Sequence, residues 1–201
     1  MRKYLKEFIT FHDVWLMLCF ILLALIGMAS VFTNVFLWLF FILGIILYII
    51  SEYTTHRFFF HMKAPKNKVF LAFMKRIHYD HHEDPDDLKL LFLPIWYSLP
   101  QLFVLLLIGF LFTGEMAFGL ALFVGAACTL LYYEWTHYIA HRPVQPKSAW
   151  AKWVKKLHLL HHYKNENYWF GVTNPSMDYL FGTMKDGKDV SKSETARKLD
   201  V

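Results

Sequence analysis

Four long apolar blocks constrain the fold of this 201-residue chain more than any other feature. They are Val14–Phe32, Val35–Ile50, Pro94–Phe112 and Gly114–Tyr133. A helix needs about 20 apolar residues to cross a hydrocarbon core, and three of the blocks reach or approach that length. The second block is shorter, so we expect its helix to continue into SEYTTHRFFFH. Because the chain is short for two domains, we predict a single membrane-embedded domain over residues 1–201. Its fold class is all-α integral membrane, with four transmembrane helices in two hairpins.

The basic residues predict the orientation of these helices. Of the 21 lysines and arginines, three precede the first block, seven lie between the second and third, and eleven follow the fourth. Loops rich in Lys and Arg stay on the cytoplasmic side, so both termini and the middle loop are expected in the cytoplasm. The net charge of +5 indicates affinity for an anionic lipid surface. Nucleic-acid binding would explain the charge but not the apolar blocks.

Two histidine-rich segments form an internal repeat. The first half reads FLAFMKRIHYDHH at Phe70–His82, and the second reads WAKWVKKLHLLHH at Trp150–His162. Apolar residues occupy matching positions at helical spacing, and a basic pair matches on another face. Each segment is therefore expected to form an amphipathic helix along the cytoplasmic membrane surface.

Each half contributes a histidine pair followed by a histidine triple, and together these contain ten of the eleven histidines. They are His56, His61, His78, His81 and His82 in the first half, and His137, His141, His158, His161 and His162 in the second. The triples share one helix face, and so does the second pair, which is spaced by four. The first pair is spaced by five, or about 140° on a regular helix. Either the helix distorts there, for example as a π-bulge, or the two rings serve different sides of the site.

Ten imidazoles in one pocket would repel one another if protonated and would lack partners if neutral. A metal ion resolves both problems, since neutral imidazole is the commonest protein ligand for metals. Ten ligands are too many for one ion and suit two, so we predict a cytoplasmic helical cap that holds a histidine-rich dimetal site. Imidazole binds zinc, copper, iron or nickel, so the residues leave the metal open. The carboxylates nearest to the clusters are candidate acceptors for the second N–H of a bound ring. They are Glu52, Asp80, Glu83, Asp84 and Glu134.

The motifs HRFFFH, HYDHH, HYIAH and HLLHH resemble those of the membrane-bound fatty acid hydroxylase superfamily. EYTTHRFFFH, YYEWTHYIAH and KKLHLLHHYKNENYWFGVTNPSMDYLFGT are similar to its fatty acid 2-hydroxylase branch, over about Glu52–Thr183. The resemblance implies insertion of one oxygen atom of O2 at C2 of a fatty acyl chain, free or within a ceramide-type sphingolipid. It implies that all ten histidines above are ligands of two metal ions, functionally iron. Zinc has no redox chemistry, so zinc in a preparation would stand in for iron.

The same resemblance implies catalytic residues and partners. Tyr133 and Glu134 match a tyrosine–acidic pair ahead of the third motif and are expected to act in catalysis. The chain begins about a dozen residues before its first apolar block, so the electrons are expected from a separate donor of cytochrome b5 or ferredoxin type. The substrate is expected to be a lipid acyl chain that enters sideways from the bilayer. The membrane is a bacterial inner membrane or the endoplasmic reticulum membrane.

Two other functions share part of this pattern. Another superfamily member, a hydroxylase or desaturase acting on a sphingoid base, sterol or carotenoid, would carry the same motifs. A membrane metal transporter would need ionisable residues deep inside its spans. The acidic residues nearest to the spans, Glu52, Glu115 and Glu134, lie at block edges, which disfavours transport.

Overall fold

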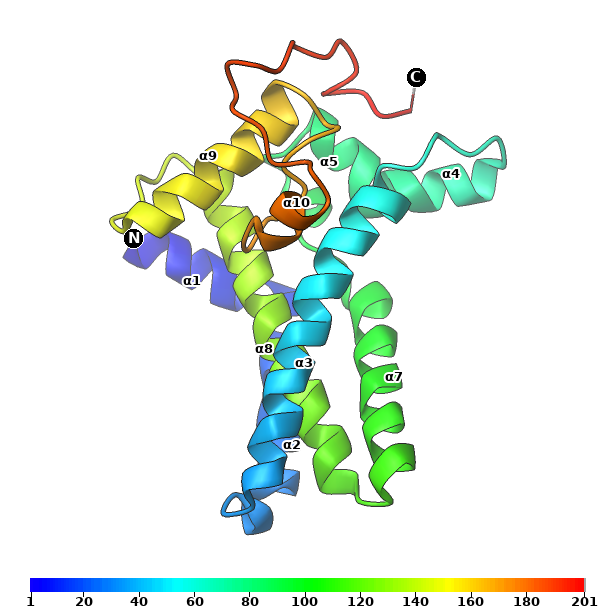
Figure 1. Ribbon diagram of the computed structural model, residues 1–201, viewed down its shortest axis with the longest axis vertical. Coiled ribbons are helices and arrows are strands. Elements are labelled where there is room, and N and C mark those ends of the chain that lie inside the picture. The colour runs from blue at the N-terminus through cyan, green and yellow to red at the C-terminus, as the bar shows by residue number, and fades with distance from the viewer. Residues whose placement is uncertain (201) are drawn as a thin grey trace. The chain divides into compact units, whose positions relative to one another are not determined.

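The computed structural model describes residues 1–200, and no strand occurs within that range. The elements are α1 (Arg2–Thr10), α2 (His12–Gly27), the 3₁₀ turn η1 (Ala29–Val31), α3 (Val35–Thr54), the π-helix η2 (Thr55–Phe60), α4 (Lys68–Met74), the π-helix η3 (Lys75–Tyr79), α5 (Asp80–Glu83), α6 (Leu88–Leu91), α7 (Ile95–Thr113), α8 (Met116–Ala140), α9 (Ala149–Tyr163) and α10 (Ser176–Leu180) (Figure 1). The predicted all-α class is confirmed.

The chain divides into two compact units. We call Met1–Ile49 with Leu93–Tyr132 the helical unit, and Ile50–Phe92 with Tyr133–Val201 the histidine unit. Helices α3 and α8 begin in the helical unit and end in the histidine unit. That the whole chain acts as one domain stays a prediction.

Three helical stretches are long and apolar enough to cross a membrane. They are Val35–Phe60, Leu88–Thr113 and Met116–Ala140. Helices α1 and α2 are bent by 74° at their junction and make a fourth candidate only when counted as one span. The continuation of the second block beyond Ile50 is confirmed. These are the helices of an integral membrane protein, whereas the fourth span and the cytoplasmic side of the cap stay predictions.

The first apolar block forms a shorter helix than its sequence suggests. Helix α2 ends at Gly27, and a 3₁₀ turn follows at Ala29–Val31. At 1.5 Å per residue its 16 residues rise only about 24 Å. Hydropathy does not reveal this ending, because the turn, Ala-Ser-Val, contains no charged residue and only one polar one.

Glycines bring helices of the helical unit into backbone contact. A Cβ atom at Gly44 of α3 would meet the carbonyl oxygen of Leu122 of α8, and a Cβ at Gly125 of α8 would meet that of Phe41. Small residues allow such close approach between membrane helices. Helices α7 and α8 form the predicted second hairpin, which turns at Gly114 in the left-handed conformation (φ 75°).

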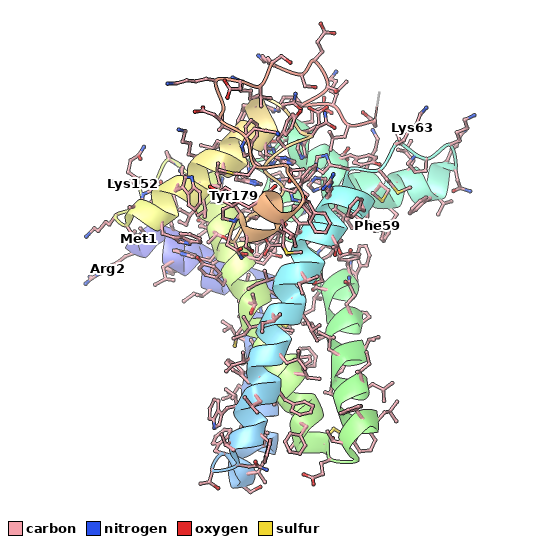
Figure 2. The ribbon with its side chains drawn as sticks, viewed as in Figure 1. Met1, Arg2, Phe59, Lys63, Lys152 and Tyr179 are labelled. Carbon is pink, nitrogen blue, oxygen red and sulfur yellow. The ribbon has the colours of Figure 1, made fainter. Side chains whose placement is uncertain are left out.

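The histidine unit contains the two predicted amphipathic segments as helices. Met74 and Ile77 of the first are buried, and so are the matching Val154 and Leu157 of α9. Trp150, at the outer end of the second stripe, is 45% exposed, so the buried face is shorter than predicted. Lys152 and Lys156 of α9 are exposed, as Figure 2 shows for Lys152, whereas Lys155 is partly buried.

Candidate metal centre

The ten histidines of the pairs and triples come together in two groups of five within the histidine unit. The first group is His56, His61, His78, His82 and His161, and the second group is His81, His137, His141, His158 and His162. In each group one nitrogen from every ring lies within 4.8 Å of all the others. Nine of the ten rings are buried and His61 is half-buried. The eleventh, His12, lies beside Asp13 on the exposed surface of the helical unit and joins neither group.

The internal repeat relates the two groups. Aligning the triples matches His78 with His158, His81 with His161 and His82 with His162. Each group takes the pair and the two outer rings of its own triple, together with the middle ring of the other triple. His161 thus belongs to the first group and His81 to the second. Neither half of the chain completes a group without the other.

Matching contacts in the two groups have nearly the same length. In the first group the Nε2 atoms of His61 and His78 lie 2.9 Å apart, and in the second those of His141 and His158 are also 2.9 Å apart. Each exchanged ring also contacts one ring of the other half's pair, although not the matching one. Nε2 of His161 lies 3.0 Å from that of His61, and Nε2 of His81 lies 2.8 Å from that of His137.

The π-helix η2 explains how the first pair tolerates a spacing of five. The amide of His61 donates to the carbonyl of His56 at 3.2 Å, which is the i to i+5 bond of a π turn. The two ring centroids then lie 5.0 Å apart, close to the 5.3 Å between His137 and His141 in α8. Of the two alternatives for this pair, the distorted helix is confirmed.

The two groups are adjacent. The rings of His82 and His162, one from each group, stack with centroids 4.0 Å apart and planes at 15°. His81 and His82 are also successive residues in different groups. Two ions held by these groups would therefore be neighbours, as a dimetal site requires.

Burial keeps the rings in the neutral form that binds metals. It is the largest cause that holds the pKa of His61, His78 and His81 well below 6.5, and neighbouring imidazoles lower each pKa further. Burial likewise lowers the pKa of His82 to about 3. Neutral rings whose nitrogens face one another at 2.8–3.1 Å are a donor set that fits two metal ions. That these histidines bind metal stays a prediction.

Three rings of the first group are backed by main-chain carbonyls. Nδ1 of His56 lies 2.5 Å from the carbonyl oxygen of Phe170, and Nδ1 of His161 lies 2.8 Å from that of Tyr168. Nδ1 of His82 lies 2.8 Å from the carbonyl oxygen of Ala196. A carbonyl can only accept, so each Nδ1 carries the proton and leaves Nε2 as the metal-binding atom.

For His56, His82 and His161 these carbonyls take the place of the carboxylates that the sequence suggested as acceptors. Glu52 accepts instead from the main chain of Val172 and Thr173. Asp80 is partly exposed, and Glu83 and Asp84 are exposed. Sequence patterns miss the carbonyls because every residue carries one.

The predicted catalytic residues lie on α8, one turn before His137. Tyr133 and Glu134 are both buried, and the ring of Tyr133 has its centroid 5.5 Å from that of His137. The structure thus places the tyrosine beside the second group. Participation of the two residues in catalysis stays a prediction.

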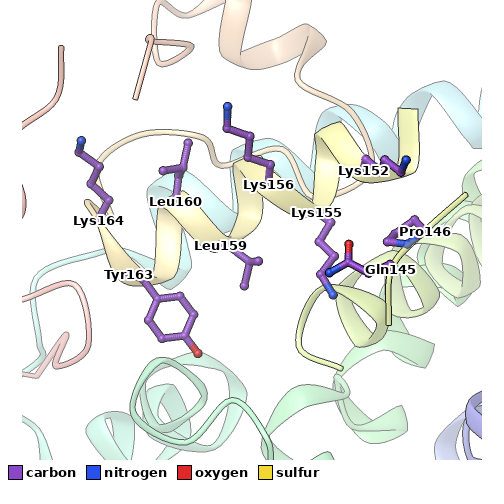
Figure 3. Close-up of a pocket in the computed structure, with 9 residues that line it drawn as sticks. All are labelled: Gln145, Pro146, Lys152, Lys155, Lys156, Leu159, Leu160, Tyr163 and Lys164. Atoms are coloured by element: carbon purple, nitrogen blue, oxygen red, sulfur yellow. The ribbon is translucent and has the colours of Figure 1, made fainter. Parts of the chain in front are cut away.

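The outer side of α9 carries a pocket that is separate from the histidines. Its volume is about 580 Å³ (Figure 3). It is lined by Gln145, Pro146, Lys152, Lys155, Lys156, Leu159, Leu160, Tyr163 and Lys164. None of the ten histidines lines this cavity, so it is not the metal centre.

Comparison with known proteins matches the segment that carries the histidines. A family model described as fatty acid hydroxylase matches residues 41–183. The fatty acid 2-hydroxylase of Rattus norvegicus is 32% identical over 153 residues, which cover 75% of this chain and 40% of the rat protein. The ceramide very long chain fatty acid hydroxylase scs7 of Schizosaccharomyces pombe is 34% identical over 155 residues, covering 72% of this chain and 42% of that protein.

A solved structure is also similar. It is described as full length scs7p with only the hydroxylase domain visible, and it has a TM-score of 0.75 and 26% sequence identity. The match covers 88% of this chain and 67% of that one. The chain thus spans less than half the length of the rat and fission-yeast relatives.

Proposed function

This chain belongs to the fatty acid hydroxylase family, and from that membership we propose that it uses O2 to hydroxylate the acyl chain of a lipid at C2. The observation that carries the proposal is the pair of interlocked five-histidine groups, in which nine of the ten rings are buried. Relatives named fatty acid 2-hydroxylase and ceramide hydroxylase support the choice of acyl chain and carbon. The substrate is a free fatty acid or a ceramide-type sphingolipid.

Cleavage of an unactivated C–H bond requires an oxidant that amino-acid side chains do not supply. Two iron ions bound by the ten histidines would provide that redox chemistry, with O2 and two electrons from outside. The protein's own contribution is to keep the rings neutral, hold them in two fixed sets and exclude water around them. Burial of nine of the ten rings serves all three purposes. Zinc, which is bound by the same ligands but is not redox-active, would give an inactive protein.

Tyr133 and Glu134 are the proposed catalytic side chains. The phenol next to His137 and the carboxyl group that follows it can each hold or pass a proton at the second group. The electrons come from a separate protein of cytochrome b5 or ferredoxin type. The proposed arrangement is one domain with four spans and both termini in the cytoplasm, in a bacterial inner membrane or the endoplasmic reticulum membrane.

Lipid analysis of a host that lacks 2-hydroxylated lipids tests this proposal. Expression of the chain should add one oxygen atom to acyl chains, and fragmentation in the mass spectrometer should locate it at C2. The variant His158→Ala should abolish the product, whereas His12→Ala, outside both groups, should retain it. A double bond, or an oxygen atom on a sphingoid base or sterol, would identify a different activity within the superfamily.

A further inference from the structure

We infer that the two histidine groups bind their metal ions with unequal affinity, and that Glu52 is a positioning residue that makes the first group the tighter one. The inference rests on the proposed function only in taking the histidines as metal ligands. It concerns how the protein holds the rings in place, which differs between two groups that otherwise correspond ring by ring.

The difference lies behind the rings, on the side away from the facing nitrogens. In the first group the Nδ1 atoms of His56, His82 and His161 each have a main-chain carbonyl within hydrogen-bond distance. In the second group four Nδ1 atoms are buried and have no hydrogen-bond partner among residues 1–200. They belong to His81, His141, His158 and His162. Rings fixed by such bonds are oriented before the metal arrives, and loss of one such partner typically lowers metal affinity by about 10–100-fold.

Two of the three carbonyls come from one short loop, Tyr168–Thr173. Glu52 binds one end of this loop. Its Oε1 accepts from the amides of Val172 (2.8 Å) and Thr173 (2.9 Å), and its Oε2 accepts from the hydroxyl of Thr173 (2.6 Å). Glu52 is one helical turn before His56, so the carboxylate and the ring reach the same loop from one helix face.

A second buried carboxylate holds the middle of the loop. Asp178 of α10 accepts from the amides of Phe170 (2.9 Å) and Gly171 (2.8 Å). The amides of residues 170–173 are therefore all bound by two carboxylates. This fixes the carbonyl of Phe170, which accepts from His56.

The backbone conformation of the loop also limits its freedom to move. Trp169 is fully buried with φ +58°, a value that a bulky residue adopts only when its surroundings impose it. A Cβ atom at Gly171 would meet the carbonyl oxygen of Asn174. The loop is therefore built in one conformation, and the first group inherits that rigidity through two of its rings.

Zinc titration of the metal-free protein in detergent, against a competing chromophoric chelator, tests the inference. We expect two binding steps whose affinities differ by about 10-fold or more. His56→Ala should remove the tighter step and His158→Ala the weaker one. Glu52→Ala should weaken the tighter step by about 10–100-fold and leave the weaker step unchanged.

Two further variants separate positioning from general damage to the fold. Glu52→Gln keeps an oxygen that accepts from the loop amides, so it should restore part of the lost affinity. Glu83→Ala removes an exposed acidic residue next to His82 that does not contact the loop, and both steps should stay as in the parent. Two steps of equal affinity, or an equal effect of Glu52→Ala on both, would overturn the inference.

The titration uses neither lipid nor O2, so its outcome is independent of the reaction. Unequal binding without any 2-hydroxylated product would leave the inference standing and refute the proposed function. Formation of the 2-hydroxylated product by a protein with two equivalent zinc-binding steps would support the proposed function and refute the inference.

Discussion

His81 and His161 are the residues at which the two halves of the chain exchange histidine rings. Each lies in the middle of one triple and joins the group of the other half. Alanine at either position should therefore remove a ligand from the other half's group.

Pairs of substitutions test this exchange through metal content, measured by elemental analysis after dialysis against a weak chelator. His161→Ala with His78→Ala removes two ligands from the first group only, so about one ion per chain should remain. His161→Ala with His158→Ala removes one ligand from each group, so both ions should be depleted. The reverse pattern would show that each triple serves its own half.

At the scale of single residues, the sequence predicted which histidines come together better than it predicted what each of them contacts. The repeated spacing singled out the ten histidines that converge, and the cost of gathering so many imidazoles in one pocket led to the prediction of bound metal ions. The exchange of His81 and His161 was not predictable. Spacing shows which rings share a helix face, but it does not show which helix faces pack against each other. The contacts of Glu52 and Asp178 with the loop Tyr168–Thr173 were not predictable either, because both carboxylates accept from main-chain amides, which every residue except proline carries.

At the scale of elements, the end of α8 depends on a lysine of α9. The amine of Lys155 donates to the carbonyls of Ile139 (2.9 Å), Arg142 (2.7 Å) and Val144 (2.9 Å). Figure 3 shows its side chain directed toward the segment that carries Gln145. The last carbonyls of a helix have no partner within the helix, so this amine stabilises the chain just after His141.

Lys155→Met should therefore lower the free energy of unfolding by about 1–3 kcal/mol, since it leaves these carbonyls without their charged donor. Thermal unfolding of the metal-free protein in detergent measures the effect. The matched variant Lys156→Met changes an exposed neighbour and should cost no more than about 0.5 kcal/mol. Equal losses in the two variants would contradict the assigned capping role.

The π turn makes a second prediction about an element. Deleting the exposed Phe58 gives the first pair the spacing of four found in the second pair, so η2 should relax into a regular α-helix with both rings still in place. Metal content should stay at the parental value. Loss of metal on deletion of Phe58 would contradict the proposed role of the π turn.

Helix identity was predictable here, and helix endings were not. The second apolar block continues as a helix through the first histidine pair, as the sequence indicated. Helix α2 ends at Gly27, and the 3₁₀ turn that follows contains no charged residue that would have marked the ending in the sequence.

At the scale of the whole molecule, the buried rings predict how stability depends on pH when metal is removed. Eight rings outside the candidate spans have a pKa lowered by burial. They are His61, His78, His81, His82, His141, His158, His161 and His162. The unfolded chain keeps a histidine pKa near 6.5, so below that pH it binds more protons than the folded chain. The stability is therefore fully present above about pH 6.5 and is lost as the pH falls.

The metal-free protein should accordingly show a melting temperature that falls between about pH 7.5 and about pH 5. The zinc-loaded protein should resist the change over the upper part of that range, because a bound ring cannot take up a proton until its ion leaves. His12→Ala should reproduce the parental curve, since His12 belongs to neither group. A flat curve for the metal-free protein would contradict this account.

The sequence predicted the long helices of the molecule but not its division into two compact units. Apolar blocks predicted the long helices, and the hairpin of α7 and α8 turns at Gly114 as expected. The two compact units were not foreseen, because α3 and α8 each continue as one helix through the boundary, although the second and fourth apolar blocks end there, at Ile50 and Tyr133.

The exchange of middle rings also has a consequence for how a ribosome makes this chain. His61 and His161 meet in the first group although 100 residues separate them in the order of synthesis. The amino-terminal half can gather four of its ligands early, but the fifth emerges only when the second triple does. On the proposed metal binding, final enclosure of either ion would wait until translation of the second triple is complete, so metal insertion would be a late step for the nascent polypeptide.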